Sequence, residues 1–252
     1  MTLNEASVSI IIPTFREAKN IPELIQRIVQ VDFSPRSFEV ILVDDNSQDG
    51  TREVVKILQG RYPWVHLLVR LGPKSLSAAA MEGFQKARYP LVLLMDADLS
   101  HPPEKIPEML AQLSDPAVDF VIGSRYVCGG SAAELWPVTR RLTSRFAALL
   151  AQLLISRRVK DPLSGFFALR KRALARCDRL RPIGWKIGLE LMLKCHCKNI
   201  KEVPIHFSER LHGKSKFNFR VASDYLRHVN RLLIYKLVRF IASPNEVGRG
   251  VG

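Results

Sequence analysis

Two aspartates, Asp96 and Asp98, stand one residue apart directly after the apolar run of residues 91–95. Such a run predicts a strand buried on both faces of a sheet, and open α/β sheets bind ligands at the carboxyl ends of their strands. The period of two in an extended chain is expected to point both carboxylates the same way. Because like charges repel unless a partner lies between them, the pair predicts a hard divalent ion shared with a phosphate-bearing substrate. The alternative is that both aspartates cap a helix over residues 102–113.

A second acidic loop follows the apolar strand predicted over residues 38–43. Asp44 and Asp45 stand at its carboxyl end, as Asp96 and Asp98 do at theirs. We expect Asp45 to bind the ligand and Asp44 to support the sheet. His101, after the other aspartate pair, is expected to orient its loop, with metal ligation as the alternative.

The elements that must position these loops alternate along the chain. Apolar runs predict strands, and apolar residues at helical spacing predict the helices between them. The predicted strands cover residues 8–12, 38–43, 64–69, 91–95, 119–123, 167–169 and 200–207, and the predicted helices include 52–58, 74–87, 102–113, 137–155, 187–195 and 217–241. This order predicts an α/β fold with a mostly parallel sheet flanked by helices. The glycine-rich loops of dinucleotide-binding folds and of P-loop proteins do not follow the first strand, which disfavours both classes.

The chain of 252 residues carries a formal net charge of +14, which predicts a polyanionic partner such as a phosphorylated substrate or an anionic membrane. Nucleic acid is disfavoured, because the basic residues are not interleaved with aromatic residues that would stack on bases.

Four cysteines, Cys128, Cys177, Cys195 and Cys197, lack zinc-site spacing. We expect them to be reduced thiols. No apolar run approaches the roughly 20 residues of a membrane-spanning helix, and the N-terminus lacks a secretory signal. These features predict a peripheral protein on the cytoplasmic side of a membrane.

The predicted helices over residues 137–155 and 217–241 are amphipathic. The second carries a basic face opposite its apolar stripe, a pattern typical of helices that lie in a membrane interface. Packing of this helix on its own domain is the alternative. We therefore expect one domain over residues 1–216 and an amphipathic C-terminal helix and tail over 217–252.

Six short blocks, taken in order, resemble glycosyltransferase family two, and within it the dolichol-phosphate mannose synthases and related polyprenyl-phosphate glycosyltransferases. The blocks lie at residues 13–17, 43–51, 96–103, 123–126, 161–166 and 210–216. Each block alone is a weak signal, and their order makes the resemblance specific. It extends over residues 7–216.

The resemblance implies a GT-A fold and a metal-dependent transfer of mannose from GDP-mannose to dolichyl or polyprenyl phosphate, with inversion at the sugar carbon. Residues that match the family's nucleotide-sugar site are Pro13, Phe15, Glu17, Val43, Asp45, Asp96, Ala97, Asp98, Arg210 and Lys216. Those that match its acceptor-phosphate site are Arg125, Arg140 and Ser144. Asp96, Asp98 and Ser100 match its site for Mg²⁺ or Mn²⁺, with serine at a position where relatives often have glutamine. The resemblance implies catalytic roles for Asp96, Asp98 and Arg125.

Two other functions fit the same residues. One is a polyprenyl-phosphate glucosyl- or aminoarabinosyl-type transferase that uses a UDP-sugar. The other is a non-catalytic module that binds membranes through its basic face.

Overall fold

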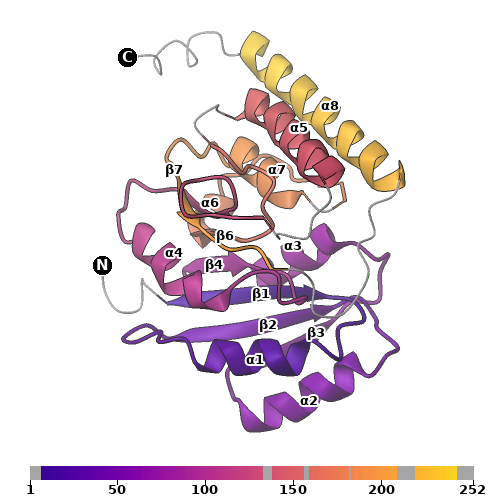
Figure 1. The fold of residues 1–252 in the computed structure, drawn as a ribbon, viewed down its shortest axis with the longest axis vertical. Helices are drawn as coiled ribbons and strands as arrows, with labels where there is room; N and C mark the ends of the chain where they lie inside the picture. The colour runs from indigo at the N-terminus through magenta and orange to yellow at the C-terminus, as the bar shows by residue number, and fades with distance from the viewer. Residues whose placement is uncertain are drawn as a thin grey trace.

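A seven-stranded sheet forms the centre of the protein (Figure 1). The computed structural model describes residues 7–132, 138–155, 159–181, 183–184, 186–208 and 219–242, with the backbone alone for 138–141 and 219–222. The strands are β1 (Val8–Thr14), β2 (Phe38–Asp44), β3 (Val65–Val69), β4 (Leu91–Leu94), β5 (Phe120–Ser124), β6 (Phe167–Arg170) and β7 (Ile200–Pro204). The predicted strands are therefore confirmed, with shifted ends.

The strand order is β3-β2-β1-β4-β6-β5-β7. Strands β1 to β4 pair in parallel, as do β5 and β7, and β6 runs antiparallel to both β4 and β5. The carboxyl ends of β1, β2 and β4 consequently share one edge of the sheet, which brings the loops that follow them together. The mostly parallel α/β sheet is confirmed, and β7 lies at an edge, where its Pro204 breaks no ladder.

Helices cover both faces of the sheet. They are α1 (Ile21–Val29), α2 (Thr51–Arg61), α3 (Leu76–Lys86), α4 (Ile106–Gln112), α5 (Val138–Leu154), α6 (Lys171–Leu174), α7 (Ile187–Lys194) and α8 (Phe219–Ala242), with a 3₁₀ turn, η2 (Pro103–Lys105), before α4. One core lies between the sheet and α1, α2 and α4, and includes Ile10, Leu24 and Leu93. The other lies against α3 and α7, and includes Ile11, Phe84 and Leu191. Neighbouring residues Ile10 and Ile11 enter opposite cores because side chains alternate along a strand.

Helices α5 and α8 lie side by side as an outer layer beyond α7 (Figure 1). A small core joins them to α7 through Ala151, Leu189 and Leu232. Beneath α8, the carboxylate of Glu190 on α7 is buried. It accepts bonds from Lys194 Nζ at 2.6 Å and from the backbone N–H of Arg181 at 2.8 Å, and it lies 3.1 Å from His228 Nε2 of α8. A buried charge thus fastens the outer layer to the main fold.

The cysteines differ from the expectation. A disulfide joins Cys177 to Cys195, whose Cα atoms lie 4.1 Å apart, while Cys128 and Cys197 are free. The prediction of four reduced thiols is wrong for this pair, because the fold brings two cysteines 18 residues apart within the roughly 7 Å that a disulfide can bridge.

Candidate active site

The loop after β2 holds its two aspartates in different roles. Asp44 is fully buried and accepts bonds from Ser47 N at 2.9 Å and Ser47 Oγ at 2.5 Å, with Arg52 Nε at 3.3 Å. Its carboxylate therefore holds the loop that follows β2, whereas the prediction was that Asp44 supports the sheet. Asp45 lies nearer the surface, and its backbone N–H donates to the carbonyl of Thr14 on β1 at 3.0 Å.

Asp45 also joins β2 to the next two elements. Its carboxylate pairs with the guanidinium of Arg70 and accepts the backbone N–H of Ser75 at 2.7 Å. Arg70 in turn reaches Glu82 on α3 at 3.0 Å. Ser75 caps α3 by accepting the N–H of Ala78 at 3.2 Å. The carboxylate that was predicted to hold the nucleotide is thus held in one orientation by a partner 25 residues away.

The loop after β1 carries the other residues predicted to contact the nucleotide. The ring of Phe15 lies under two cations, with Lys74 Nζ 4.1 Å and the guanidinium of Arg16 5.2 Å from its centroid. Glu17 accepts a bond from Asn20 Nδ2 at 2.6 Å at the start of α1. Pro13 and Val43 are paired residues of β1 and β2, and both are buried. These four residues therefore lie around the ends of two neighbouring strands.

The aspartate pair after β4 lies in a bent loop. Strand β4 ends at Leu94, and Leu99 adopts a φ of +65°. The predicted strand alternation therefore does not extend to Asp96 and Asp98, since it requires extended backbone. Asp98 is buried and accepts both Ser100 N at 3.2 Å and Ser100 Oγ at 2.5 Å, whereas 30% of the Asp96 side chain is exposed.

His101 orients this loop, as predicted. Its Nδ1 accepts the backbone N–H of Asp96 at 3.0 Å, which leaves the proton of a neutral ring on Nε2. The ring is buried and stacks on Phe166 with centroids 5.2 Å apart. Burial lowers the pKa of His101 to about 4 despite the opposing charge of Asp98, so the ring is neutral at pH 7.

Gly165 lies opposite the Asp96 carboxylate. A Cβ at this position would stand 3.6 Å from Asp96 Oδ2 and 3.4 Å from the His101 ring, so larger side chains would fill the space beside the carboxylate. Two carboxylates and a hydroxyl are hard oxygen donors of the kind that Mg²⁺ and Mn²⁺ prefer. Within the described ranges, no three His, Cys, Asp or Glu side chains group closely enough to hold a metal unaided. The donor set therefore fits an ion that takes its remaining ligands from a substrate.

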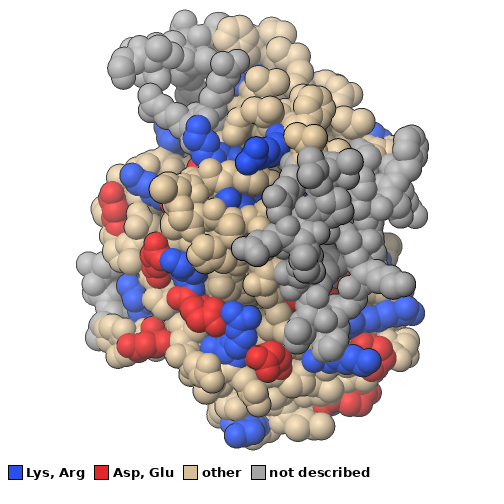
Figure 2. Space-filling view, in the orientation of Figure 1, with Lys and Arg blue, Asp and Glu red and all other residues tan. Residues whose placement is uncertain are grey.

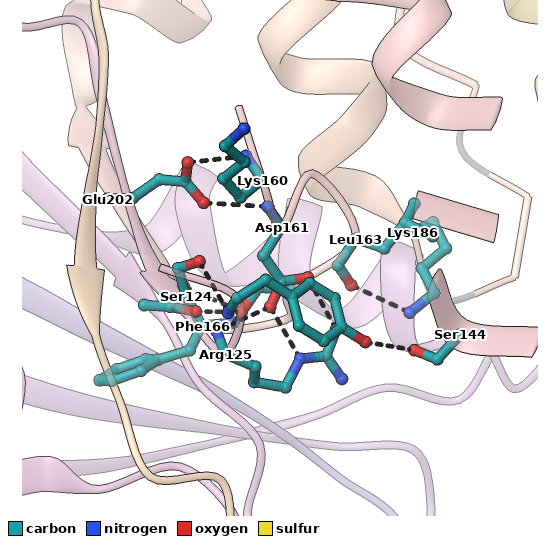
Figure 3. A network of polar contacts seen from close by, with 12 residues as sticks. Ser124, Arg125, Ser144, Lys160, Asp161, Leu163, Phe166, Lys186 and Glu202 are labelled. Atoms are coloured by element: carbon teal, nitrogen blue, oxygen red, sulfur yellow. Dashed lines mark hydrogen bonds and ion pairs between the residues drawn. The ribbon is translucent and has the colours of Figure 1, made fainter. Parts of the chain in front are cut away.

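Arg125, at the end of β5, is the centre of a second polar network (Figure 3). Its Nε and one terminal nitrogen donate to the two oxygens of Asp161, each at 2.7 Å, and its backbone N–H donates to Asp161 Oδ2 at 3.0 Å. Asp161 is itself fixed by its N–H, which donates to Glu202 Oε1 on β7 at 2.9 Å. Burial opposes the charge of Arg125, but Asp161 outweighs it and raises the pKa of the guanidinium. The planar group is permanently charged and held in one orientation.

Ser144 and Lys186 border the same network (Figure 3). Ser144 on α5 shares a hydrogen bond of 2.8 Å with the hydroxyl of Tyr126, the residue after Arg125. Lys186 directly precedes α7, and its Nζ donates to the carbonyl of Leu163 at 3.0 Å. Burial, with Arg125 acting in the same direction, lowers the pKa of Lys186 to about 8.

The fold thus places the members of each of two predicted groups near one another. The nucleotide residues from β1 and β2 form one group, and Asp96, Ala97 and Asp98 lie at the end of the neighbouring β4. Arg125 and Ser144 are linked through Tyr126. Arg140 belongs to α5, but its side chain lies outside the described residues, as do Arg210 and Lys216 entirely. The site roles of all these residues stay predictions.

Three residues of this region were absent from the predicted site. Asp161 and Gly165 lie in a block that carries the family resemblance, so their place in the motif was a usable signal. Lys186 had no such signal, because only the fold brings the residue before α7 next to the end of β5.

Comparison with known proteins gives consistent results. A family model described as glycosyl transferase family 2 matches residues 9–177. Proteins named dolichol-phosphate mannosyltransferase are similar over most of the chain. The one from Pyrococcus furiosus is 40% identical over 92% of this chain and 67% of its own length. Those from Mycosarcoma maydis and Saccharomyces cerevisiae are 38% and 37% identical, over 93% and 90% of this chain and 82% and 87% of theirs.

Among solved structures, glucosyl-3-phosphoglycerate synthase from Mycobacterium tuberculosis superimposes with a TM-score of 0.66 at 18% identity, covering 93% of this chain and 82% of that one. That crystal contains Mn²⁺, uridine diphosphate and glucosyl-3-phosphoglycerate. At this identity the likeness establishes a common fold of the GT-A type, which agrees with the predicted fold.

Proposed function

Because the chain belongs to glycosyl transferase family 2 and is therefore a glycosyltransferase, we propose that it transfers mannose from GDP-mannose to the phosphate of dolichol or a related polyprenol. The observation that carries the proposal is the similarity of 37–40% to three proteins named dolichol-phosphate mannosyltransferase. The two clusters described above, one acidic and one basic, support it.

In the proposed reaction, an oxygen of the acceptor phosphate forms a bond to the anomeric carbon of mannose while the bond from that carbon to the donor diphosphate breaks. The electron pair of the broken bond leaves with GDP, and the displacement inverts the anomeric carbon. The acceptor is already an anion at neutral pH, since the second pKa of a phosphate monoester is about 6. The reaction therefore needs no strong general base, and its demands are positioning and charge stabilisation.

The two clusters divide this work. Asp45, Phe15 and the other predicted residues of the first two loops bind the nucleotide. Asp96 and Asp98, with Ser100 supporting Asp98, hold Mg²⁺ or Mn²⁺, which when bound stabilises the negative charge on the departing diphosphate. Arg125 binds the acceptor phosphate, because a guanidinium held in one plane by Asp161 matches the geometry of phosphate oxygens. Arg140 and Ser144 complete the acceptor site, and Arg210 and Lys216 contact the donor phosphates.

A second part of the proposal concerns the membrane. Within the described part of the chain, no helix is long and apolar enough to cross a bilayer. The predicted apolar stripe of α5 nevertheless faces outwards, with Phe146 63% and Leu149 58% exposed. On α8, Leu237 and Phe240 are exposed to a similar degree. Much of the outer surface of the upper part of α8 is free of charged side chains, with lysine and arginine side chains gathered below it (Figure 2).

Leu237 and Phe240 border an apolar groove of about 440 Å³ between α5, α7 and α8, which is also lined by Leu153, Leu154 and Leu233. Large exposed apolar surfaces mark sites of contact with a partner or a membrane. The basic residues Arg227 and Lys236 of α8 favour anionic headgroups. We propose that α5 and α8 lie in the membrane interface, where the prenyl chain of the acceptor resides. The protein is accordingly expected to float with vesicles containing anionic lipid, and recovery only at the bottom of the gradient would contradict this part of the proposal.

A transfer assay tests the catalytic part. The protein is incubated with a short polyprenyl phosphate, Mg²⁺ or Mn²⁺, and a panel of GDP- and UDP-sugars that includes GDP-mannose and UDP-glucose. We expect mannosyl polyprenyl phosphate from GDP-mannose alone, and loss of product when EDTA removes the metal. Transfer only from a UDP-sugar would show that GDP-mannose is not the donor. No transfer from any donor would contradict the proposal as a whole.

A further inference from the structure

Lys186 is a partly buried cation for which the described residues supply no opposite charge at contact distance. Desolvation of its ammonium group lowers its pKa to about 8. Its hydrogen-bond partner is the neutral carbonyl of Leu163. No carboxylate of the described chain lies within 4.0 Å of Nζ, whereas Arg125 has Asp161 at 2.7 Å. An ammonium offers three donors, so one backbone carbonyl does not satisfy it.

Removing a charge from water is costly unless an opposite charge replaces the solvent. Asp161, the nearest buried anion of this network, already receives three hydrogen bonds from Arg125. Two cations therefore share a region in which Asp161 is committed to Arg125, while Asp96, whose charge acts on both cations, does not reach contact distance of Lys186. A bound anion would supply the opposite charge that Lys186 lacks.

The position of Lys186 indicates which anion enters. Leu163, which holds Nζ, lies in the same short loop as Asp161, which holds Arg125. Arg125 also acts electrostatically on Lys186, and Tyr126, the residue after Arg125, shares a hydrogen bond with Ser144 of α5. The predicted nucleotide residues of the first two loops lie instead beyond β1 and β2 and are held by Arg70, Ser75 and Asn20. The charge of Asp96, after β4, acts on both Lys186 and Arg125. Lys186 consequently lies near the predicted acceptor residue Arg125, away from the loops after β1 and β2.

We propose that Lys186 is a further acceptor-binding residue, whose ammonium contacts an oxygen of the phosphate monoester that Arg125 receives. The proposal rests on the function proposed above. It adds the residue that directly precedes α7, so that the end of β5, helix α5 and the start of α7 each contribute a group to the phosphate. As the bond to the sugar forms, Lys186 keeps the unreacting oxygens of the phosphate in place, and it neither gives up nor takes a proton.

The same phosphate chemistry occurs in the donor diphosphate, so the experiment compares both substrates. Lys186→Met removes the charge and keeps the length of the side chain, and Lys186→Arg keeps the charge. Lys201→Met is the matched control, because Lys201 is an exposed lysine on β7. Steady-state kinetics give kcat and KM for polyprenyl phosphate and for GDP-mannose.

For Lys186→Met we expect kcat/KM for polyprenyl phosphate to fall by about tenfold to a hundredfold, the usual effect of losing a hydrogen bond to a charged group. The KM for GDP-mannose is expected to change less than about twofold, given that a lost contact to one substrate leaves binding of the other intact. Lys186→Arg is expected to recover part of the loss, and Lys201→Met to match the wild type. Wild-type kinetics for Lys186→Met would overturn the proposal, as would a rise in the KM of GDP-mannose alone, which would assign Lys186 to the donor.

A binding measurement without donor separates this proposal from the function it rests on. Calorimetry with farnesyl phosphate is expected to show binding by the wild type and by Lys201→Met, and loss of binding by Lys186→Met with an unchanged melting temperature. If Lys186→Met melts lower, the comparison is made with Lys186→Arg and Lys186→Gln, where only the arginine variant is expected to bind. Lys186-dependent binding without mannose transfer would contradict the proposed function and support this inference, whereas binding that is independent of Lys186 would overturn the inference alone.

Discussion

The two sides of the candidate active site treat charge in opposite ways. On the donor side, every predicted carboxylate of the β2 loop is already paired: Asp44 with Ser47 and Arg52, and Asp45 with Arg70 and Ser75. On the acceptor side, Arg125 is paired with Asp161, but the ammonium of Lys186 has only a carbonyl as its partner. In the proposed assignment, the donor side is therefore organised before a ligand binds, and the acceptor side is completed by one.

The helices around the two sides also differ, in how much of their apolar surface is buried. The helices next to the donor loops, α1 and α2, bury residues such as Leu24 and Val55 in the core. On the proposed acceptor side, α5 and α8 leave large apolar side chains exposed. Unmatched positive charge beside an exposed apolar surface is complementary to a molecule with an anionic head and an apolar chain. The proposed amphiphilic acceptor would therefore be recognised through a charge and an apolar surface that the protein leaves unsatisfied.

The substitution with the largest expected effect on activity lies between the two sides, at Asp98. Asp98→Ala is expected to abolish transfer, a loss of at least about a thousandfold in kcat, since it removes a charge that stabilises the reacting diphosphate. Asp98→Asn is expected to lose activity similarly while keeping an acceptor for Ser100. Radiolabelled mannose transfer measures the rate, and circular dichroism checks the fold. Full activity of either variant would remove the Asp98 carboxylate from the mechanism.

A second change separates the outer layer from the main fold. Glu190→Gln leaves Lys194 and His228 without their buried carboxylate, and breaking such a pair typically costs about 3–5 kcal/mol of unfolding free energy. Urea denaturation at pH 7 measures the loss. The control is Glu53→Gln, an exposed glutamate on α2 for which no loss is expected.

The same variant has a defined pH dependence. Burial opposes the charge of Glu190, but the bonds from His228, Arg181 and Lys194 outweigh it and lower its pKa from 4.5 to about 2. A carboxyl whose folded pKa is depressed stabilises the protein fully above its unfolded pKa and loses this contribution as the pH falls through the folded value. The stability difference between the wild type and Glu190→Gln is therefore expected to shrink between pH 4.5 and pH 2. A difference that stayed constant over this range would show that the Glu190 charge is not what fastens α8.

A substitution with a smaller expected effect tests whether donor binding and acceptor binding use different residues. Arg140→Ala is expected to raise the KM for polyprenyl phosphate about tenfold and to leave the KM for the nucleotide-sugar nearly unchanged, because it removes one charged contact to the acceptor. Arg145→Ala, an exposed arginine one turn further along α5, is the control and is expected to behave as the wild type. Equal effects of Arg140→Ala on both substrates would exclude it from the acceptor site.

The smallest expected effect concerns the membrane surface. The double variant Phe146→Glu and Phe240→Glu is expected to reduce flotation with anionic vesicles by about tenfold, since partial burial of each ring contributes roughly 1 kcal/mol and a charge opposes it. Ile57→Glu changes an apolar residue on α2 that is more exposed than either ring, and it serves as the control. Unchanged flotation of the double variant would place the membrane-binding surface elsewhere.

The sequence by itself determined the sheet, its alternation with helices and the family. Runs such as residues 38–43 and 91–95 are apolar throughout, and only strands covered on both faces use such runs, so local composition was sufficient. The loops at the strand ends were found for the same reason: Asp45 and Asp98 stand within a few residues of the strands that position them.

Tertiary structure alone decided how distant charges are paired. Asp45 meets Arg70 across 25 residues, Arg125 meets Asp161 across 36, and Cys177 forms a disulfide with a cysteine expected to be free. It also decided that the apolar stripe of α5 faces outwards, that α8 buries Leu232 but exposes Leu237 and Phe240, and that the charge of Arg125 acts on Lys186. Local sequence encodes which face of a helix is apolar, because that depends on residues three and four apart. What covers that face, and which charge neutralises another, depends on segments that only the folded chain brings together.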